Sequence, residues 1–123
     1  MKIQELLEDF KGYLEARGFS PRTVKTYVLY VDIFDRYLKQ KDIENIENIT
    51  RNVIDQYQID ISTKNEYMQI VLSTATRIGR LIGVMSFFRF LTRKGLIGAD
   101  PTSSIELPRL PKRPSPQYLT YSD

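Results

Sequence analysis

The chain has 123 residues, 41% of them hydrophobic, which is enough for one domain with its own core. It contains no cysteine and no histidine. These two absences exclude disulfides, thiolate zinc sites, cysteine nucleophiles, histidine metal ligands and histidine-based catalytic triads. The net charge is only +3, and no stretch of roughly 18 apolar residues is present to cross a membrane. We therefore expect a cytoplasmic protein with no membrane partner, no metal and no cofactor.

Two helices are predicted in the first third of the chain. Apolar residues at helical spacing predict a helix over residues 2–17, and Gly18 follows it as a residue suited to ending a helix. Ser20 and Pro21 then form an N-cap with proline at the first helical position, so a second helix is expected from Pro21 to about Lys39. The side chains that project away from its core stripe are Arg22, Lys25, Thr26 and Leu29.

The middle of the chain predicts a connection and a third helix. Residues 40–49 are expected to form a loop held by buried isoleucines, which are Ile43, Ile46 and Ile49. Thr50 is expected to cap a third helix whose inner side comprises Val53, Ile54, Tyr57 and Ile61. Residues 62–72 either extend this helix or form a turn, and the sequence leaves both alternatives open.

A fourth helix is predicted between Ser73 and Gly95, where the longest apolar-periodic segment contains no acidic residue. Ser73 or Thr74 is its expected cap, and Leu96 and Ile97 are expected to fold back on its last turn. The first turns place one apolar set on the expected core side, comprising Ile78, Ile82 and Met85. The opposite, solvent-facing side is expected to carry Thr76, Arg77 and Arg80. Gly79 and Gly83 would permit close approach of another helix or of a ligand, with helix packing favoured.

The remainder of the chain is rich in proline and cations, a composition that favours an extended linker over a packed core. Asp100 and Pro101 prevent continuation of the fourth helix, and four prolines follow between residues 108 and 116. We expect a compact helical domain over residues 1–106, and a basic linker with the start of a second domain over residues 107–123. No alternation typical of strands is present, so the predicted fold class is all-α.

Positive charge is concentrated in two separate segments. Residues 19–41 carry five Lys or Arg against two acidic residues, and residues 69–123 carry eight against three. Between them, residues 42–68 carry two against six. This pattern is expected when two elements form one basic face, and a helix N-terminus would add free backbone N–H groups that suit a phosphate. On composition alone, an ordinary solvated surface stays an open alternative.

Three segments carry motifs whose order is informative. The second predicted helix starts with Ser-x-x-Thr-x-x-x-Tyr, at Ser20, Thr23 and Tyr27. Residues 74–101 contain a threonine, basic residues, an aliphatic run with paired phenylalanines, then glycine, an aliphatic residue and Asp-Pro. The basic proline segment precedes LTYSD. Together, nearly the whole chain resembles the N-terminal core-binding domain of the tyrosine recombinase (phage integrase) family, and LTYSD resembles the start of that family's catalytic domain.

The resemblance implies a compact SAM-like bundle of four to five helices that clamps duplex DNA beside a crossover site. It implies three partners: double-stranded DNA, a C-terminal catalytic domain of the same polypeptide, and further recombinase protomers assembling on DNA. It implies no small-molecule substrate and no catalytic residue in this chain, because the family's catalytic arginines, histidines and tyrosine belong to the other domain. The side chains expected to contact DNA are Arg22, Thr23, Lys25, Thr26, Thr76, Arg77, Arg80, Lys94, Arg109, Lys112 and Arg113.

Two alternatives stay open. One is a helical protein-interaction module whose exposed Leu29 and Ile33 and whose proline-rich tail bind protein partners. The other is a stand-alone fragment that competes with a complete recombinase. Salt-sensitive affinity for duplex DNA would separate the first alternative from a DNA-binding domain.

Overall fold

The computed structural model describes residues 1–63 and 72–109, and these residues form helices and connecting segments without a β-strand. The elements are α1 (Ile3–Ala16), α2 (Pro21–Gln40), the short 3-10 helix η1 (Ile46–Asn48), α3 (Arg51–Ile61) and α4 (Thr74–Arg93). The predicted all-α fold is confirmed, whereas the predicted proline linker falls almost entirely outside the described residues. No helix of the described chain is both long enough and apolar enough to span a membrane.

Hydroxyl side chains fix the starts of three helices, as the sequence predicts. The Ser20 Oγ accepts a hydrogen bond from the Thr23 backbone N (3.2 Å), and Pro21 occupies the first helical position. Thr50 caps α3 in the same way, with its Oγ1 3.4 Å from the Val53 backbone N. Ser73 caps α4 through the Thr76 backbone N at 3.2 Å. Each cap satisfies one of the backbone donors that a helix start leaves unpaired.

The ends of α1, α2 and α4 share one geometry. In each, a residue with positive φ is followed by an apolar residue whose backbone N–H donates to a carbonyl five positions back, which is the Schellman motif. Gly18 (φ 83°) and Gly95 (φ 74°) occupy the left-handed position after α1 and α4, as predicted. After α2 the position is held by Asp42 (φ 60°). The closing bonds are Phe19 N to Leu14 O (3.2 Å), Ile43 N to Leu38 O (2.9 Å) and Leu96 N to Leu91 O (3.0 Å).

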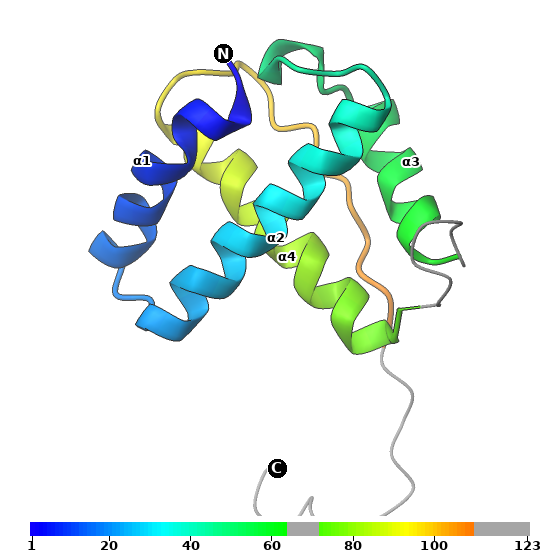
Figure 1. Ribbon diagram of the computed structural model, residues 1–123, viewed down its shortest axis with the longest axis horizontal. Helices are drawn as coiled ribbons and strands as arrows, with labels where there is room; N and C mark the ends of the chain where they lie inside the picture. The colour runs from blue at the N-terminus through cyan, green and yellow to red at the C-terminus, as the bar shows by residue number, and fades with distance from the viewer. Residues whose placement is uncertain (64–71, 110–123) are drawn as a thin grey trace, which may run out of the picture.

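Helices α2 and α4 cross at the centre of the domain, with α1 on one side of the crossing and α3 on the other (Figure 1). Two glycines of α4 permit this approach. A Cβ on Gly83 would lie 3.0 Å from the Tyr30 Cβ, and a Cβ on Gly79 would lie 3.3 Å from the Tyr30 ring. The expectation that these glycines serve helix packing is therefore confirmed.

An aromatic cluster fills the space around this crossing. Phe10, Phe34, Phe87, Phe88 and Phe90 are all fully buried, and the Phe10 and Phe87 rings meet edge to face at 5.2 Å. The apolar faces of α1 and α2 are buried, the predicted inner side of α3 is buried at three of four positions, and the predicted loop anchors are buried at two of three. Besides Phe10 and Phe34, the buried apolar residues of these segments are Ile3, Leu6, Leu14, Val24, Val31, Leu38, Ile46, Ile49, Ile54, Tyr57 and Ile61.

The predicted core side of the first half of α4 is wrong. Ile78, Ile82 and Met85 are only partly buried, whereas Leu81, Val84 and Phe88 are buried and share a helix face with the arginines. The buried face of α4 therefore runs through the side on which Arg77 and Arg80 were expected to meet solvent. Apolar side chains lie on both sides of this helix, so periodicity could not decide which side packs against α2 and α3.

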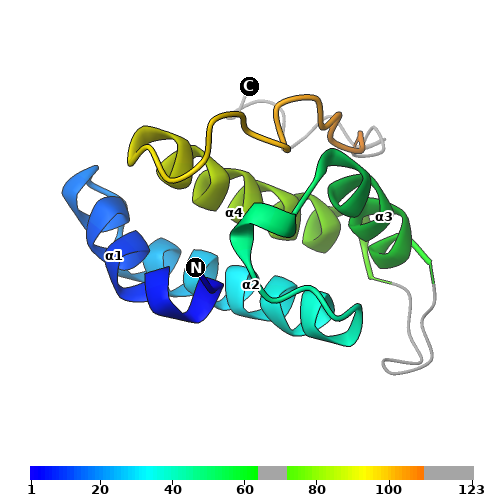
Figure 2. The ribbon, with the colours of Figure 1, turned by 90° about the horizontal axis from the view of Figure 1, so that it is seen from above.

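The segment after α4 returns along the bundle, on the side of α4 away from α2 (Figure 2). The Asp100 carboxylate accepts hydrogen bonds from the backbone N (2.8 Å) and hydroxyl (2.6 Å) of buried Thr102. The Gln58 side chain of α3 donates to the carbonyl O of Glu106 (2.8 Å). The predicted domain limit between residues 106 and 107 stays a prediction.

The sequence left open whether residues 62–72 extend the third helix. Helix α3 ends at Ile61 with Ser62 as its C-cap, and residues 64–71 lie outside the described residues.

Candidate nucleic-acid interface

The first turns of α2 hold two exposed cations above a capped helix start. Arg22 and Lys25 are exposed, and neither forms a salt bridge within the described residues. The Ser20 hydroxyl donates to the Thr23 Oγ1 (3.0 Å), and the Thr26 hydroxyl donates to the carbonyl O of Arg22 (3.0 Å). Both threonines are thus tied to their own helix, and the two cations are the groups here most open to an external anion.

The start of α4 has the same capping geometry as the start of α2, but its arginines are not exposed. The Ser73 hydroxyl donates to the Thr76 Oγ1 (2.9 Å), as Ser20 does to Thr23. The side chain of Arg77, however, is half-buried and donates from Nη2 to the Thr74 Oγ1 (3.1 Å). It lines a hollow of about 300 Å³ between α3, α4 and the returning segment, together with Leu81 and Pro108.

Arg80 is partly buried and lies close to Tyr57 of α3. Burial raises the pKa of Tyr57 to about 12, and the positive charge of the neighbouring Arg80 opposes part of this rise. The Nε atoms of Arg77 and Arg80 are both buried without a hydrogen-bond partner within the described chain. The expectation that Arg77 and Arg80 lie on the solvent-facing side of α4 is therefore corrected, because both are partly buried and lie on the packed side of the helix.

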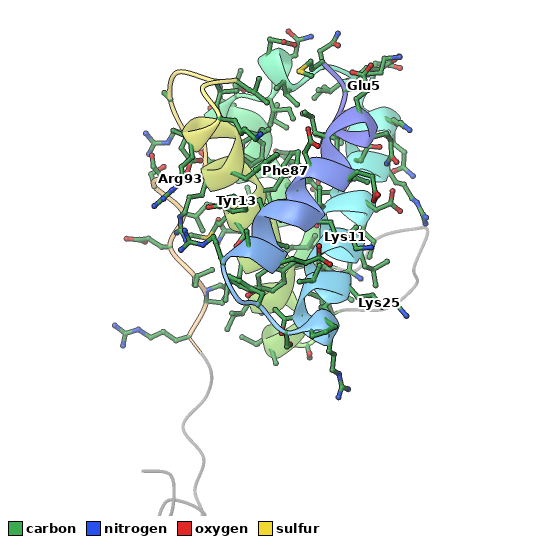
Figure 3. The ribbon with its side chains drawn as sticks, turned by 90° about the vertical axis from the view of Figure 1, so that its left-hand side faces the viewer. Glu5, Lys11, Tyr13, Lys25, Phe87 and Arg93 are labelled. Atoms are coloured by element: carbon green, nitrogen blue, oxygen red, sulfur yellow. The ribbon has the colours of Figure 1, made fainter. Side chains whose placement is uncertain are left out.

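The remaining candidate cations are not all brought together. Arg109 is exposed and follows Pro108, which lines the same hollow as Arg77. Lys94 is the C-cap of α4, at the other end of a 20-residue helix that is about 30 Å long. Figure 3 shows Lys25 and Arg93, the neighbour of Lys94, projecting from opposite sides of the domain. Lys112 and Arg113 lie outside the described residues.

The cations in the second half of α2 and the lysine directly after it are paired, in contrast to those at its start. Arg36 lies 2.8 Å from Asp32, Lys39 lies 3.3 Å from Asp35, and Lys41 lies 3.7 Å from Asp60. Near the N-terminus, Met1 and Lys2 pair with two glutamates of the α2–α3 connection, Glu47 (3.2 Å) and Glu44 (3.3 Å). The cations at the start of α2 are therefore among those that have no carboxylate partner in the described residues.

Comparison with protein families identifies the domain. The family described as "Phage integrase, N-terminal SAM-like domain" matches residues 7–95, most of the chain. The chain belongs to this family. The matched part of this SAM-like domain runs from the second turn of α1 to the glycine after α4, and so contains both helix starts described above.

Curated relatives of this SAM-like domain are named tyrosine recombinase XerC. The protein of Myxococcus xanthus is 32% identical over 111 residues, covering 89% of this chain and 35% of the relative. That of Lactobacillus delbrueckii subsp. bulgaricus is 32% identical over 120 residues, covering 96% and 38%. That of Caldanaerobacter subterraneus subsp. tengcongensis is 28% identical over 138 aligned positions, covering 100% and 39%. The chain thus spans less than two fifths of the length of these relatives. No solved structure matches it.

Sequence reasoning missed two features of this SAM-like domain that shape the candidate site. One is the position of Arg80 beside Tyr57, and the other is the contact of Pro108 with the hollow beside Arg77. Both depend on how α3, α4 and the returning segment pack, and no local pattern in the sequence reports that packing. The absence of acidic residues from α4 indicated that its arginines lack carboxylate partners on the same helix, but it did not show which of these arginines are exposed.

Proposed function

We propose that this SAM-like domain binds double-stranded DNA beside a recombination site, while a catalytic domain of the same polypeptide cuts and rejoins the strands. The family and the names of the curated relatives support this proposal. The observation that carries it is the start of α2, where Arg22 and Lys25 are exposed beside a helix N-terminus with no carboxylate partner in the described chain. Further recombinase protomers on the same DNA are its expected partners, with no small-molecule substrate.

The physical role of the α2 start is to hold the DNA backbone. Phosphates attract cations and free backbone N–H groups alike, and the positive end of the helix dipole adds to both. These contacts fix the position of the protein on the duplex and carry most of its salt dependence. Binding by this chain alone is expected to be weak and strongly salt-dependent, because the other half of the proposed clamp is missing.

The two arginines of α4 have a secondary role in this proposal. Arg77 can offer DNA only part of its guanidinium, since its Nε is buried and its Nη2 already donates to Thr74. Arg80 supports the packing of α4 on α3 through its position beside Tyr57. The exposed Arg109 is close to the same end of α4 and is a better candidate for a phosphate contact. Lys94 is expected to contribute little, because it lies at the far end of the helix.

Fluorescence anisotropy with a labelled duplex at about 50 mM and about 200 mM salt tests the proposal. The double variant Arg22→Ala with Lys25→Ala should lower the affinity by about tenfold and reduce the salt slope by about 2, roughly one per lost phosphate contact. Arg89→Ala with Arg93→Ala is the matched control. These two arginines are also exposed and without a described salt bridge, but Figure 3 places Arg93 on the other side of the domain from Lys25.

The outcomes separate the alternatives. If both double variants lower affinity equally, the binding is unspecific attraction to net charge and the assignment of the α2 start is wrong. If the unaltered chain has no salt-sensitive affinity for DNA, the protein-interaction module is favoured. A chain that binds DNA and also inhibits a complete recombinase in trans would support the competing-fragment alternative.

A further inference from the structure

Leu29 is the large apolar side chain of α2 that is left exposed. Its side chain is 50% exposed, whereas Leu38, on the core side of the same helix, is 1% exposed. Among the described residues, the other large apolar side chains with comparable exposure are Met1, Ile59 and Leu107, and none of these belongs to α2. The exposure of Leu29 is thus a property of one particular helix face.

That face also carries the two unpaired cations. Leu29 lies one turn after Lys25 and two turns after Arg22, at the helical spacing that places all three on one side. The next turn begins a different environment, because Asp32 pairs with Arg36 at 2.8 Å and accepts a hydrogen bond from Gln4 (2.8 Å). Leu29 is therefore the apolar end of the part of α2 that attracts an anion.

We propose that Leu29 contacts the 5-methyl group of thymine in the major groove of the DNA that this domain binds, an inference that rests on the proposed function. A leucine cannot bind a phosphate, and the thymine methyl is the apolar group that the major groove exposes. The distance from Arg22 to Leu29 along α2 is about 10 Å, which fits within a groove about 12 Å wide. If Arg22 and Lys25 contact the DNA phosphates, the Leu29 side chain, on the same face of α2, lies toward the base edges.

The test compares two duplexes that differ only in this methyl group. One is an alternating adenine–thymine duplex, and the other is the same duplex with uracil in place of every thymine. Wherever the protein binds, the first duplex therefore presents thymine methyl groups in its major groove and the second presents none. The unaltered chain should bind the thymine duplex about fourfold more tightly, the gain expected from burying one methyl-sized group. Leu29→Ala should bind both duplexes equally. Leu107→Ala is the matched control, because Leu107 is 39% exposed and belongs to the segment after α4, not to α2.

Each result bears on one of the two proposals. Equal binding of both duplexes by the unaltered chain, with salt-sensitive affinity intact, overturns the role of Leu29 and leaves the proposed function standing. A loss of affinity in Leu29→Ala that is equal on both duplexes also overturns it. Absence of salt-sensitive DNA affinity overturns both proposals, and Leu29-dependent self-association in light scattering would then assign the residue to a protein contact. Thermal unfolding of Leu29→Ala, expected to match that of the unaltered chain, confirms that the variant folds.

Discussion

The first and last turns of α2 carry similar side chains in different surroundings. At the start, Arg22 and Lys25 are exposed and have no described carboxylate partner. In the second half, Arg36 and Lys39 each lie within 3.3 Å of a carboxylate one turn earlier on the same helix. A largely solvated pair such as Arg36–Asp32 contributes little to stability, whereas the Asp35 carboxylate of the second pair is buried. The main effect of both pairs is to cancel the field of the cations, so that an external anion is attracted to the start of α2 and not to its end.

The crossing of α2 and α4 fixes how both ends are presented, and Gly83→Ala should disturb it most. The added Cβ would lie 3.0 Å from the Tyr30 Cβ, where neither helix can yield without moving. We expect a loss of about 1–3 kcal/mol in the free energy of unfolding, measured by urea titration, despite the better helix propensity of alanine.

Gly79→Ala is the matched control for this prediction. Its Cβ would meet only the far edge of the Tyr30 ring, at 3.3 Å, and that ring can shift slightly. The variant should be neutral or up to about 1 kcal/mol more stable, as expected for removing glycine from a helix. Equal effects of the two substitutions would contradict a close helix crossing centred on Gly83.

Asp32→Asn should make the end of α2 behave more like its start. The substitution removes the carboxylate that pairs with Arg36, and the asparagine side chain can still accept the hydrogen bond from Gln4. The freed arginine would add a positive charge two turns beyond Leu29 on the same helix. We expect the salt slope of DNA binding to rise by about 1, with a severalfold gain in affinity at low salt. Arg36→Ala added to this variant should abolish the gain, and persistence of the gain without the arginine would refute the explanation.

Local signals made much of the fold predictable from sequence. Ser20, Ser73, Gly18 and Gly95 mark helix ends correctly because a cap is decided by residues within a few positions of one another. The buried stripes of α1, α2 and α3 were also predictable, since most apolar residues of each of these helices lie on one side. The pairing of Arg36 with Asp32 is similarly readable, because it follows the spacing of one helical turn.

The candidate site was predictable only in part. The exposed cations of α2 follow from its single apolar stripe, so Arg22 and Lys25 are where the sequence indicates. The arginines of α4 are not, because that helix has apolar residues on both sides and the choice between them is made by α2 and α3. The separation of Lys94 from the other cations likewise depends on the direction of α4 across the bundle, which no residue spacing reports.

Acid should weaken the end of α2 while leaving its start unaffected. Partial burial raises the pKa of Asp60, but hydrogen bonds from Tyr37 (2.7 Å) and Gln56 (2.9 Å) and the charge of Lys41 outweigh this, so the pKa is lowered overall. A lowered folded-state pKa contributes stability above the unfolded value, near 3.8, that is lost as the pH falls through the folded value. The contribution is expected to be below about 1 kcal/mol, since the group is partly solvated.

Thermal unfolding between about pH 6 and pH 2 measures this contribution, with Asp60→Asn as the comparison. The variant should show a shallower loss of stability toward low pH, because it has no carboxylate to protonate. Identical profiles would mean that Asp60 does not link the end of α2 to α3. Arg22→Ala should leave the profile unchanged, since no carboxylate of the described chain pairs with that residue.

The smallest effect is expected at Asp42, where α2 ends differently from α1 and α4. Asp42 occupies a left-handed position (φ 60°) that Gly18 and Gly95 fill elsewhere, and its charge lies at the negative end of the helix dipole. Asp42→Gly should stabilise the domain by about 0.5 kcal/mol, because relief of backbone strain slightly exceeds the added freedom of the unfolded chain. Asp42→Ala removes the same charge but keeps the strain, so it should be about 1 kcal/mol less stable than the glycine variant. Urea titration of both variants isolates the backbone term, because the loss of charge is common to the two. Equal stability of the glycine and alanine variants would show that the backbone at the end of α2 is not held in the left-handed conformation.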